Sequence, residues 1–213
     1  MGYKPSPDQG ADALPPASGR RPPLPVKIVV SGGFGVGKTT TVGSISEITP
    51  LTTEGLMTSL GAETDDTSRT PGKTTTTVAM DFGRLSIDSE LTLYLFGTPG
   101  QDRFGFMWRD IAEGALGALV IVDTGRLADC YPSIDYFEQL SLPYVVAVNR
   151  FDGAPVLDAD AIRWALAVGD DIGIVSFDAR DKLSVRDALV AVLRTALRHS
   201  VPGGRAISPA GHG

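Results

Sequence analysis

The sequence Gly-Gly-Phe-Gly-Val-Gly-Lys-Thr-Thr, residues 32–40, follows an apolar run at residues 26–30. It fits the phosphate-binding pattern of a glycine, four variable residues and then Gly-Lys-Thr. Glycines let the backbone curl so that successive N–H groups point at a phosphate chain, and the helix that follows adds its positive end. Lys38 would reach the terminal phosphates, and the Thr39 hydroxyl would ligate Mg²⁺. The alternative is an ordinary glycine-rich turn between a strand and a helix.

Charge and cysteine content narrow the classes of function. The 213 residues suffice for one domain with a full core, and their formal net charge is −6. This charge balance argues against nucleic acid as the main partner, because binding it would require a basic patch. The single cysteine, Cys130, excludes an internal disulfide and a cysteine-built zinc site, which favours a cytoplasmic location. The apolar runs are too short to cross a bilayer, so we expect any membrane attachment to come through a partner.

Short apolar runs alternate with helical patterns along the chain. Runs at residues 26–30, 78–85, 91–96, 117–123, 144–148 and 172–175 predict six strands, with amphipathic stretches between and after them. This order predicts an α/β fold of three layers, in which helices cover a mainly parallel six-stranded sheet with one antiparallel edge strand. We expect this domain at residues 25–198, with a proline-rich disordered tail at residues 1–24 and a second disordered tail at residues 199–213.

Residues 49–77 show neither the apolar runs of a strand nor the amphipathic pattern of a helix, and they are rich in Thr, Gly, Asp and Ser. A loop of this length is uncommon in a compact domain unless it has a use. We interpret it as a mobile switch, and the alternative is a disordered insertion.

Four segments, in this order, resemble the small Ras-like GTPases, a P-loop NTPase family, over roughly residues 25–198. Thr77-Val-Ala-Met-Asp-Phe resembles the end of the first switch, where Thr77 would sense the terminal phosphate through Mg²⁺. Phe96-Gly-Thr-Pro-Gly-Gln-Asp-Arg-Phe resembles the second switch, where Gly100 would face that phosphate and Gln101 would orient the attacking water. The resemblance implies a switch that binds and hydrolyses GTP, with Lys38 spreading the charge during hydrolysis.

The other two segments concern the base. Asn149-Arg-Phe-Asp152 resembles the guanine-specificity motif, and Asp178-Ala-Arg180 stands where the family has a second base contact. One carboxylate accepts from both donors on the guanine edge, whereas adenine lacks such a pair, so the motif favours GTP over ATP. Alternatively, Asn149 and Asp152 merely cap the next segment. The resemblance implies nucleotide contacts from Gly35, Val36, Gly37, Lys38, Thr39, Thr40, Thr77, Gly100, Asn149, Arg150, Asp152, Asp178, Ala179 and Arg180, and metal contacts from Thr39 and Thr77.

The second switch departs from the family pattern at its first residue. Gly97 replaces the aspartate that normally holds a Mg²⁺-bound water. Loss of such an outer-shell carboxylate commonly weakens metal binding by about ten- to a hundredfold, so we expect weakly held Mg²⁺. The sequence does not choose a substitute among Asp65, Asp66 and Asp81.

Two further departures concern hydrolysis. Phe34 adds bulk to the phosphate-binding loop, where an arginine from an activator would approach, and Pro99 stiffens the second switch. Hydrolysis would then use an arginine of this chain. Our candidate is Arg69 in the first switch, and weaker candidates are Arg103 and Arg109.

The match is closest to the bacterial GTPases encoded in conservon operons, on the string Lys73-Thr-Thr-Thr-Thr-Val-Ala-Met-Asp-Phe-Gly83. That resemblance implies partners with a roadblock domain and a sensor-kinase-like protein at the membrane. The expected function is a guanine-nucleotide switch with slow hydrolysis. The alternatives are a nucleotide-binding interaction module that scarcely hydrolyses GTP, and a P-loop kinase or ATPase.

Overall fold

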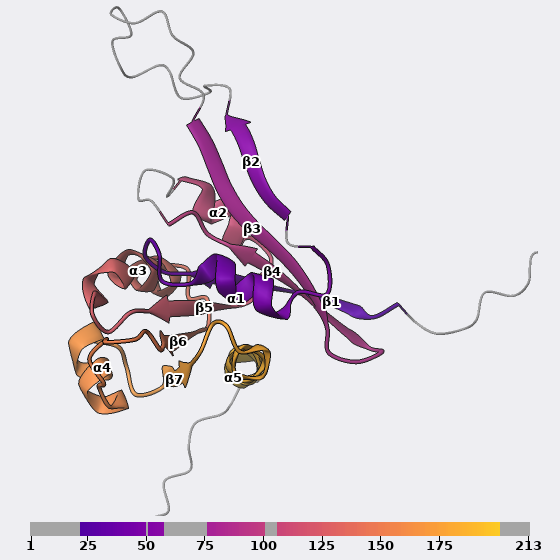
Figure 1. Cartoon of the computed structure of the whole chain (residues 1–213). Helices are drawn as coiled ribbons and strands as arrows, with labels where there is room; N and C mark the ends of the chain where they lie inside the picture. Colours follow the sequence, from indigo (N-terminus) through magenta and orange to yellow (C-terminus); the bar gives the residue numbers. More distant parts are fainter. Residues whose placement is uncertain (1–21, 50, 58–75, 101–105, 201–213) are drawn as a thin grey trace, which may run out of the picture.

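A seven-stranded sheet runs through the whole domain in the order β2-β3-β4-β1-β5-β6-β7 (Figure 1). The computed structural model describes residues 22–49, 51–57, 76–100 and 106–200. The strands are β1 (Leu24–Ser31), β2 (Leu51–Met57), β3 (Thr76–Ser86), β4 (Leu91–Gly97), β5 (Ala115–Val122), β6 (Tyr144–Asn149) and β7 (Gly173–Phe177). The helices are α1 (Lys38–Ile45), α2 (Trp108–Ala112), α3 (Tyr131–Gln139), α4 (Ala159–Leu166) and α5 (Lys182–Ser200), with a 3₁₀ turn, η2 (Leu127–Cys130), before α3.

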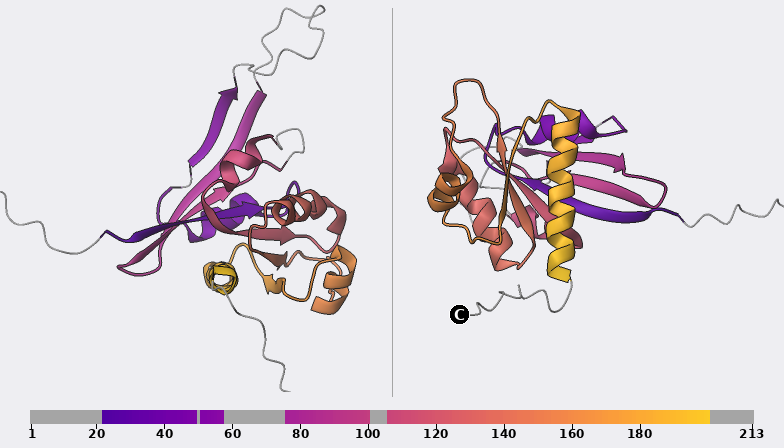
Figure 2. Two further views of the ribbon diagram at one scale, coloured as in Figure 1. Left: turned by 180° about the vertical axis from the view of Figure 1, so that it is seen from behind. Right: turned by 90° about the horizontal axis from the view of Figure 1, so that it is seen from below.

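Two hydrophobic clusters lie on opposite faces of the sheet. Ile28 of β1 packs with α1 and α5, whereas the next residue, Val29, packs with α2, α3 and α4. The same alternation divides Ile121 and Val122 of β5 between the two clusters. Side chains alternate along a strand, so a strand with helices on both sides must be apolar on both. Figure 2 shows α5 lying along the sheet beside α1, which it contacts.

The predicted fold class, a mainly parallel sheet between two layers of helices, is confirmed. Strands β4, β1, β5, β6 and β7 pair in parallel, and β3 alone runs against its neighbours. The C-terminal ends of β1, β5 and β6 therefore lie together at the same end of the sheet. Parallel α/β sheets place their ligand sites at the C-terminal ends of their strands.

The structure adds a strand that the sequence did not predict. Residues 51–57, assigned to the long loop, form β2 and pair antiparallel with β3 from Leu51↔Phe82 to Met57↔Thr76. The antiparallel strand β3 is therefore second from the edge, not at the edge. Pairs of β3 with β4 run only from Phe82 to Ser86, so the first half of β3 and β2 form a two-stranded ribbon that extends beyond the other strands (Figure 1).

The limits of the predicted domain stay a prediction. The first strand begins at Leu24 and the last helix ends at Ser200. Residues 1–21 and 201–213, which hold most of the predicted tails, and residues 58–75 of the predicted switch lie outside the described residues.

Replacement of Leu189 in α5 tests which face of this helix supports the core. Leu189 is fully buried against the sheet, whereas Leu183 on the same helix is 59% exposed. We expect Leu189→Ala to lower the free energy of unfolding by about 2–5 kcal/mol, because it leaves a cavity. Leu183→Ala is the matched control and should change it by less than about 0.5 kcal/mol. Urea denaturation measures both, and equal losses would contradict this placement of α5.

Candidate functional site

The loop between β1 and α1, residues 32–37, presents free backbone N–H groups at the start of a helix. Gly37 precedes α1 with φ 107°, a conformation that favours glycine, and no side chain caps the helix. Among the described residues, no hydrogen-bond acceptor is found for the N–H groups of Gly33, Phe34, Gly35 and Gly37. Converging N–H groups and the helix dipole both attract negative charge. The loop, called the P-loop below, is thus built to receive an anion.

One buried side chain, that of Asn149 at the end of β6, joins the P-loop to the segment after β7. Its Nδ2 donates to the carbonyl oxygen of Val36 at 3.0 Å, and its Oδ1 accepts from the N–H of Ala179 at 3.0 Å. A Cβ on Gly37 would lie 2.7 Å from Nδ2, so the close approach requires glycine there. Asn149 is 5% exposed, which makes both hydrogen bonds costly to lose.

A cavity of about 180 Å³ opens between the three segments that Asn149 joins. Nearly all its lining residues were assigned to nucleotide binding from the sequence, and only Phe151 was not. Asp152 lines the cavity and is exposed, so its carboxylate is open to a ligand. The lining residues are Gly35, Gly37, Thr40, Asn149, Arg150, Phe151, Asp152, Asp178, Ala179 and Arg180.

Asp178 and Arg180 form a two-pronged ion pair at the rim of this cavity. The guanidinium Nε and Nη2 atoms each donate to one carboxylate oxygen at 2.9 Å, and the Arg180 N–H donates to Asp178 Oδ1 at 2.9 Å. These hydrogen bonds lower the pKa of Asp178 to about 2. The pair therefore stays charged at neutral pH and braces the turn that presents the Ala179 N–H.

Lys38 carries a buried positive charge beneath the P-loop. Its Nζ donates to the carbonyl oxygens of Gly32 at 2.8 Å and Gly33 at 2.6 Å, and the residue is 8% exposed. Burial lowers its pKa to about 8, against a smaller opposing effect of Asp81. Gly100 lies against the same group, since a Cβ there would be 2.8 Å from Nζ. Lys38 and Gly100 are therefore neighbours.

The Thr39 hydroxyl donates to Asp81 Oδ2 at 2.7 Å. Asp81 lies on β3, 7% exposed, next to Gly97 of β4, because the register pairs Phe82 with Phe96. A Cβ at Gly97 would lie 3.0 Å from Asp81 Cβ and 3.2 Å from Oδ2. The carboxylate of β3 thus fills the space that a carboxylate at position 97 would need. Of the three substitutes that the sequence left open, Asp65 and Asp66 lie outside the described residues.

Several predicted site residues lie outside the described residues or away from the P-loop. Gln101, Arg69 and Arg103 lie outside the described residues. Thr77 is in β3 opposite Leu56, and its backbone alone is described. It precedes Asp81 by four residues, which places the two Cα atoms about 13 Å apart along the strand. In this arrangement Thr77 is well along the ribbon from the Thr39–Asp81 contact. Arg109 is exposed on α2.

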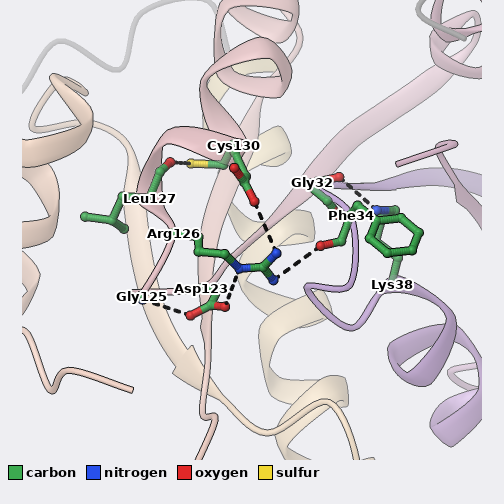
Figure 3. A network of polar contacts seen from close by, with 10 residues as sticks. Gly32, Phe34, Lys38, Asp123, Gly125, Arg126, Leu127 and Cys130 are labelled. Carbon is green, nitrogen blue, oxygen red and sulfur yellow. Dashed lines mark hydrogen bonds and ion pairs between the residues drawn. The ribbon is translucent and has the colours of Figure 1, made fainter. Parts of the chain in front are cut away.

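Sequence reasoning missed an arginine that contacts the P-loop from outside, Arg126 (Figure 3). Its Nη2 donates to the carbonyl oxygen of Phe34 at 3.3 Å, and its guanidinium pairs with Asp123 and Asp129. A signal was present in the spacing Asp-x-x-Arg-x-x-Asp directly after a buried strand. Phe34 itself is 69% exposed, so its ring stands free on the P-loop.

Known proteins resemble this chain both in sequence and in structure. The family described as conserved hypothetical ATP binding protein matches residues 30–201. The chain belongs to this family. An uncharacterised protein of Methanocaldococcus jannaschii is 33% identical over 130 residues, 60% of this chain and 71% of that protein. The FeoB G-domain from Methanococcus jannaschii is similar in structure, with a TM-score of 0.53 at 16% identity, over 81% of this chain and 98% of that one. This last likeness shows the fold alone.

Within residues 22–200, so far as the structure describes them, no helix combines the length and the apolar character that a membrane span requires.

Replacement of Lys38 tests the burial of its charge. Because the folded pKa, about 8, lies below the usual 10.5, the unfolded chain binds more protons between these values, and stability rises with pH there. Below pH 8 the folded state carries the full cost. We expect Lys38→Met to raise the melting temperature of the nucleotide-free protein at pH 7 by about 2–4 °C. This advantage should shrink as the pH approaches 10.

Circular dichroism melts at pH 7, 8, 9 and 10 measure the difference. Lys182→Met, which replaces an exposed lysine at the start of α5, is the matched control and should show no pH-dependent gap. A Lys38→Met gap that stays constant with pH would mean that the ammonium is not the destabilising group.

Proposed function

We propose that this chain binds a guanine nucleotide in the 180 Å³ cavity and acts as a molecular switch that hydrolyses GTP slowly. The observation that carries the proposal is the Asn149 contact. It joins the P-loop, whose N–H groups suit phosphates, to a rim that holds Asp152, whose carboxylate suits the guanine edge. Phosphate-binding and base-binding groups thereby line one cavity.

The choice of guanine depends on Asp152. Its exposed carboxylate lines the same cavity as Gly35 and Gly37 of the P-loop. Guanine offers N1–H and an exocyclic amine to such a group, whereas adenine would leave the carboxylate unpaired. A site built for a donor pair rejects a ligand that lacks it by several kcal/mol.

ATP is a second candidate, because the family to which the chain belongs is described as ATP binding. The P-loop, Lys38 and Thr39 serve either triphosphate equally well, so only the base contacts separate the two. Adenine would have to enter the cavity without pairing to Asp152. A direct comparison of GDP with ADP therefore decides between the candidates.

The residues around Thr39 fit a bound Mg²⁺. A hydroxyl and a carboxylate are the oxygen groups that this metal prefers, with phosphate oxygens and water completing its shell. When bound, the metal would neutralise phosphate charge. Asp81 accepts a hydrogen bond from the Thr39 hydroxyl, and this bond would leave the oxygen lone pairs of Thr39 for the metal. This relocated carboxylate replaces the one missing at Gly97 and opposes the weak metal binding that the sequence alone suggests.

The hydrolytic step is proposed to use groups of this chain. Lys38 would draw charge from the terminal phosphate, near which Gly100 also lies. Gln101 would orient water and Arg69 would supply the arginine in cis, as the sequence suggests. Without an arginine in place turnover would be slow, since such a residue is worth about 10³–10⁵ in rate.

The resemblance of the sequence to the conservon-type GTPases adds a proposal about partners. A roadblock-domain regulator and a sensor-kinase-like protein would recruit the chain to the membrane from the cytoplasm. A pull-down with the GDP-loaded and GTP-loaded protein tests this, and recovery of no roadblock-domain protein in either state would count against it.

Replacement of Asp152 tests the base assignment. We expect wild-type protein to bind GDP at least about 100-fold more tightly than ADP, and Asp152→Ala to lose most of that ratio by weakening GDP alone. Isothermal titration calorimetry measures both ligands. Asp170→Ala, which removes a fully exposed carboxylate beyond α4, is the control and should keep the ratio. Tighter binding of ADP than of GDP by wild type would favour the ATP candidate.

Replacement of Asp81 tests the metal assignment. Asp81→Asn should raise the Mg²⁺ concentration needed to retain a fluorescent GDP analogue by about ten- to a hundredfold. Gly97→Asp alone should collide with Asp81, but the double variant Asp81→Gly/Gly97→Asp makes room and should recover much of the Mg²⁺ dependence. Asp187→Asn on α5 is the control. An unchanged Mg²⁺ requirement in Asp81→Asn would exclude this carboxylate from the metal site.

A further inference from the structure

Arg126 holds three acceptors that come from two different segments. Its Nε lies 3.2 Å from Asp123 Oδ2, its Nη1 lies 3.4 Å from Asp129 Oδ2, and its Nη2 donates to the carbonyl oxygen of Phe34 at 3.3 Å (Figure 3). Asp123 is itself fixed, because its Oδ1 accepts the Gly125 N–H at 2.8 Å. The planar fork of an arginine suits such a set of acceptors, which a lysine ammonium would not hold together.

The P-loop lies directly against the segment that carries these groups. A Cβ on Gly33 would lie only 2.5 Å from Asp129 Cβ, and one on Gly35 would lie 3.7 Å from Arg126 Nη2. The guanidinium therefore rests on the outer side of the Phe34–Gly35 peptide. Gly35 is also one of the residues that line the cavity.

The peptide bond transmits this contact to the cavity. No cis peptide bond occurs in the described chain, and in a trans peptide the C=O and the N–H point in opposite directions. The Phe34 carbonyl faces Arg126, so the N–H of the same peptide, that of Gly35, faces away from it. Donation to the carbonyl fixes the tilt of this peptide and polarises its N–H, since linked hydrogen bonds strengthen one another.

Two observations indicate which phosphates this N–H would face. A Cβ on Gly100 would lie 3.2 Å from Phe34 Cα and 2.8 Å from Lys38 Nζ, so this part of the P-loop is at the terminal-phosphate end. Thr40, another lining residue, lies beyond it in α1. Gly35 is thus placed for the phosphates beyond the first.

We infer that Arg126 is a positioning residue, which aims the Gly35 N–H at the second and third phosphates of the bound nucleotide. This inference rests on the proposed nucleotide-binding function. Two carboxylates already balance the charge of Arg126, so its effect passes through the P-loop peptide and not through direct attraction to phosphate. Its loss should therefore weaken diphosphate and triphosphate binding and leave monophosphate binding almost unchanged.

The test compares GMP, GDP and a non-hydrolysable GTP analogue on wild type, Arg126→Met and Arg126→Lys by competition against a fluorescent GDP analogue. We expect Arg126→Met to weaken GDP and the GTP analogue by about tenfold and GMP by less than about twofold. Arg126→Lys, which keeps the charge but not the fork, should still lose at least about threefold on GDP. Arg186→Met, which removes an arginine paired with Asp187 on α5, is the matched control and should match wild type.

Equal losses for GMP and GDP in Arg126→Met would overturn the inference, because they would indicate general damage to the domain. Unchanged GDP affinity in both variants would overturn it as well. Should Arg126→Met fail to fold in a thermal melt, the GDP-to-GMP ratio of Arg126→Lys decides alone, and a wild-type ratio there would overturn it. Failure of wild-type protein to bind GDP would instead reject the proposed function.

Discussion

The amide of Asn149 is the contact on which the geometry of the site depends. One end of this side chain holds the P-loop carbonyl of Val36, and the other holds the N–H of Ala179 after β7. Because Asn149 is buried, neither bond has water as a ready substitute. Three segments that lie far apart in the sequence are thereby fixed at the C-terminal edge of one sheet. The nucleotide proposed to bind here would need this fixed separation between the groups that face its phosphates and those that face its base.

Strand register explains how a carboxylate, that of Asp81, is present near the P-loop although Gly97 stands where the Ras-like pattern has aspartate. The pairing of Phe82 with Phe96 sets Asp81 beside Gly97, and the absence of a Cβ at Gly97 leaves room for the Asp81 carboxylate. The two positions compete for one volume, so a carboxylate on either strand excludes one on the other. The departure at Gly97 and the presence of Asp81 are therefore two sides of one structural solution, which only the pairing of strands reveals.

Much of the fold and of the phosphate-binding end follows from local sequence signals. Buried parallel strands are continuous apolar runs, and the P-loop has a fixed spacing, so both are visible without a structure. Strand β2 was not predicted because Pro50 precedes it, Gly55 interrupts its pattern, and its position depends on pairing with β3. The contact of Arg126 with Phe34 was not predicted, because it joins residues 92 positions apart in the sequence. Long-range register and side-chain contacts are what local periodicity does not encode.

The P-loop is also where the fold accepts local destabilisation. The Lys38 ammonium is buried and donates to the carbonyl oxygens of Gly32 and Gly33, and burial lowers its pKa to about 8. The N–H groups of Gly33, Phe34, Gly35 and Gly37 have no hydrogen-bond acceptor among the described residues. An anion relieves both, since it pairs with the ammonium and accepts from the amides. Binding of the proposed nucleotide would therefore add stability to the P-loop and to the Asn149 and Arg126 contacts that hold it.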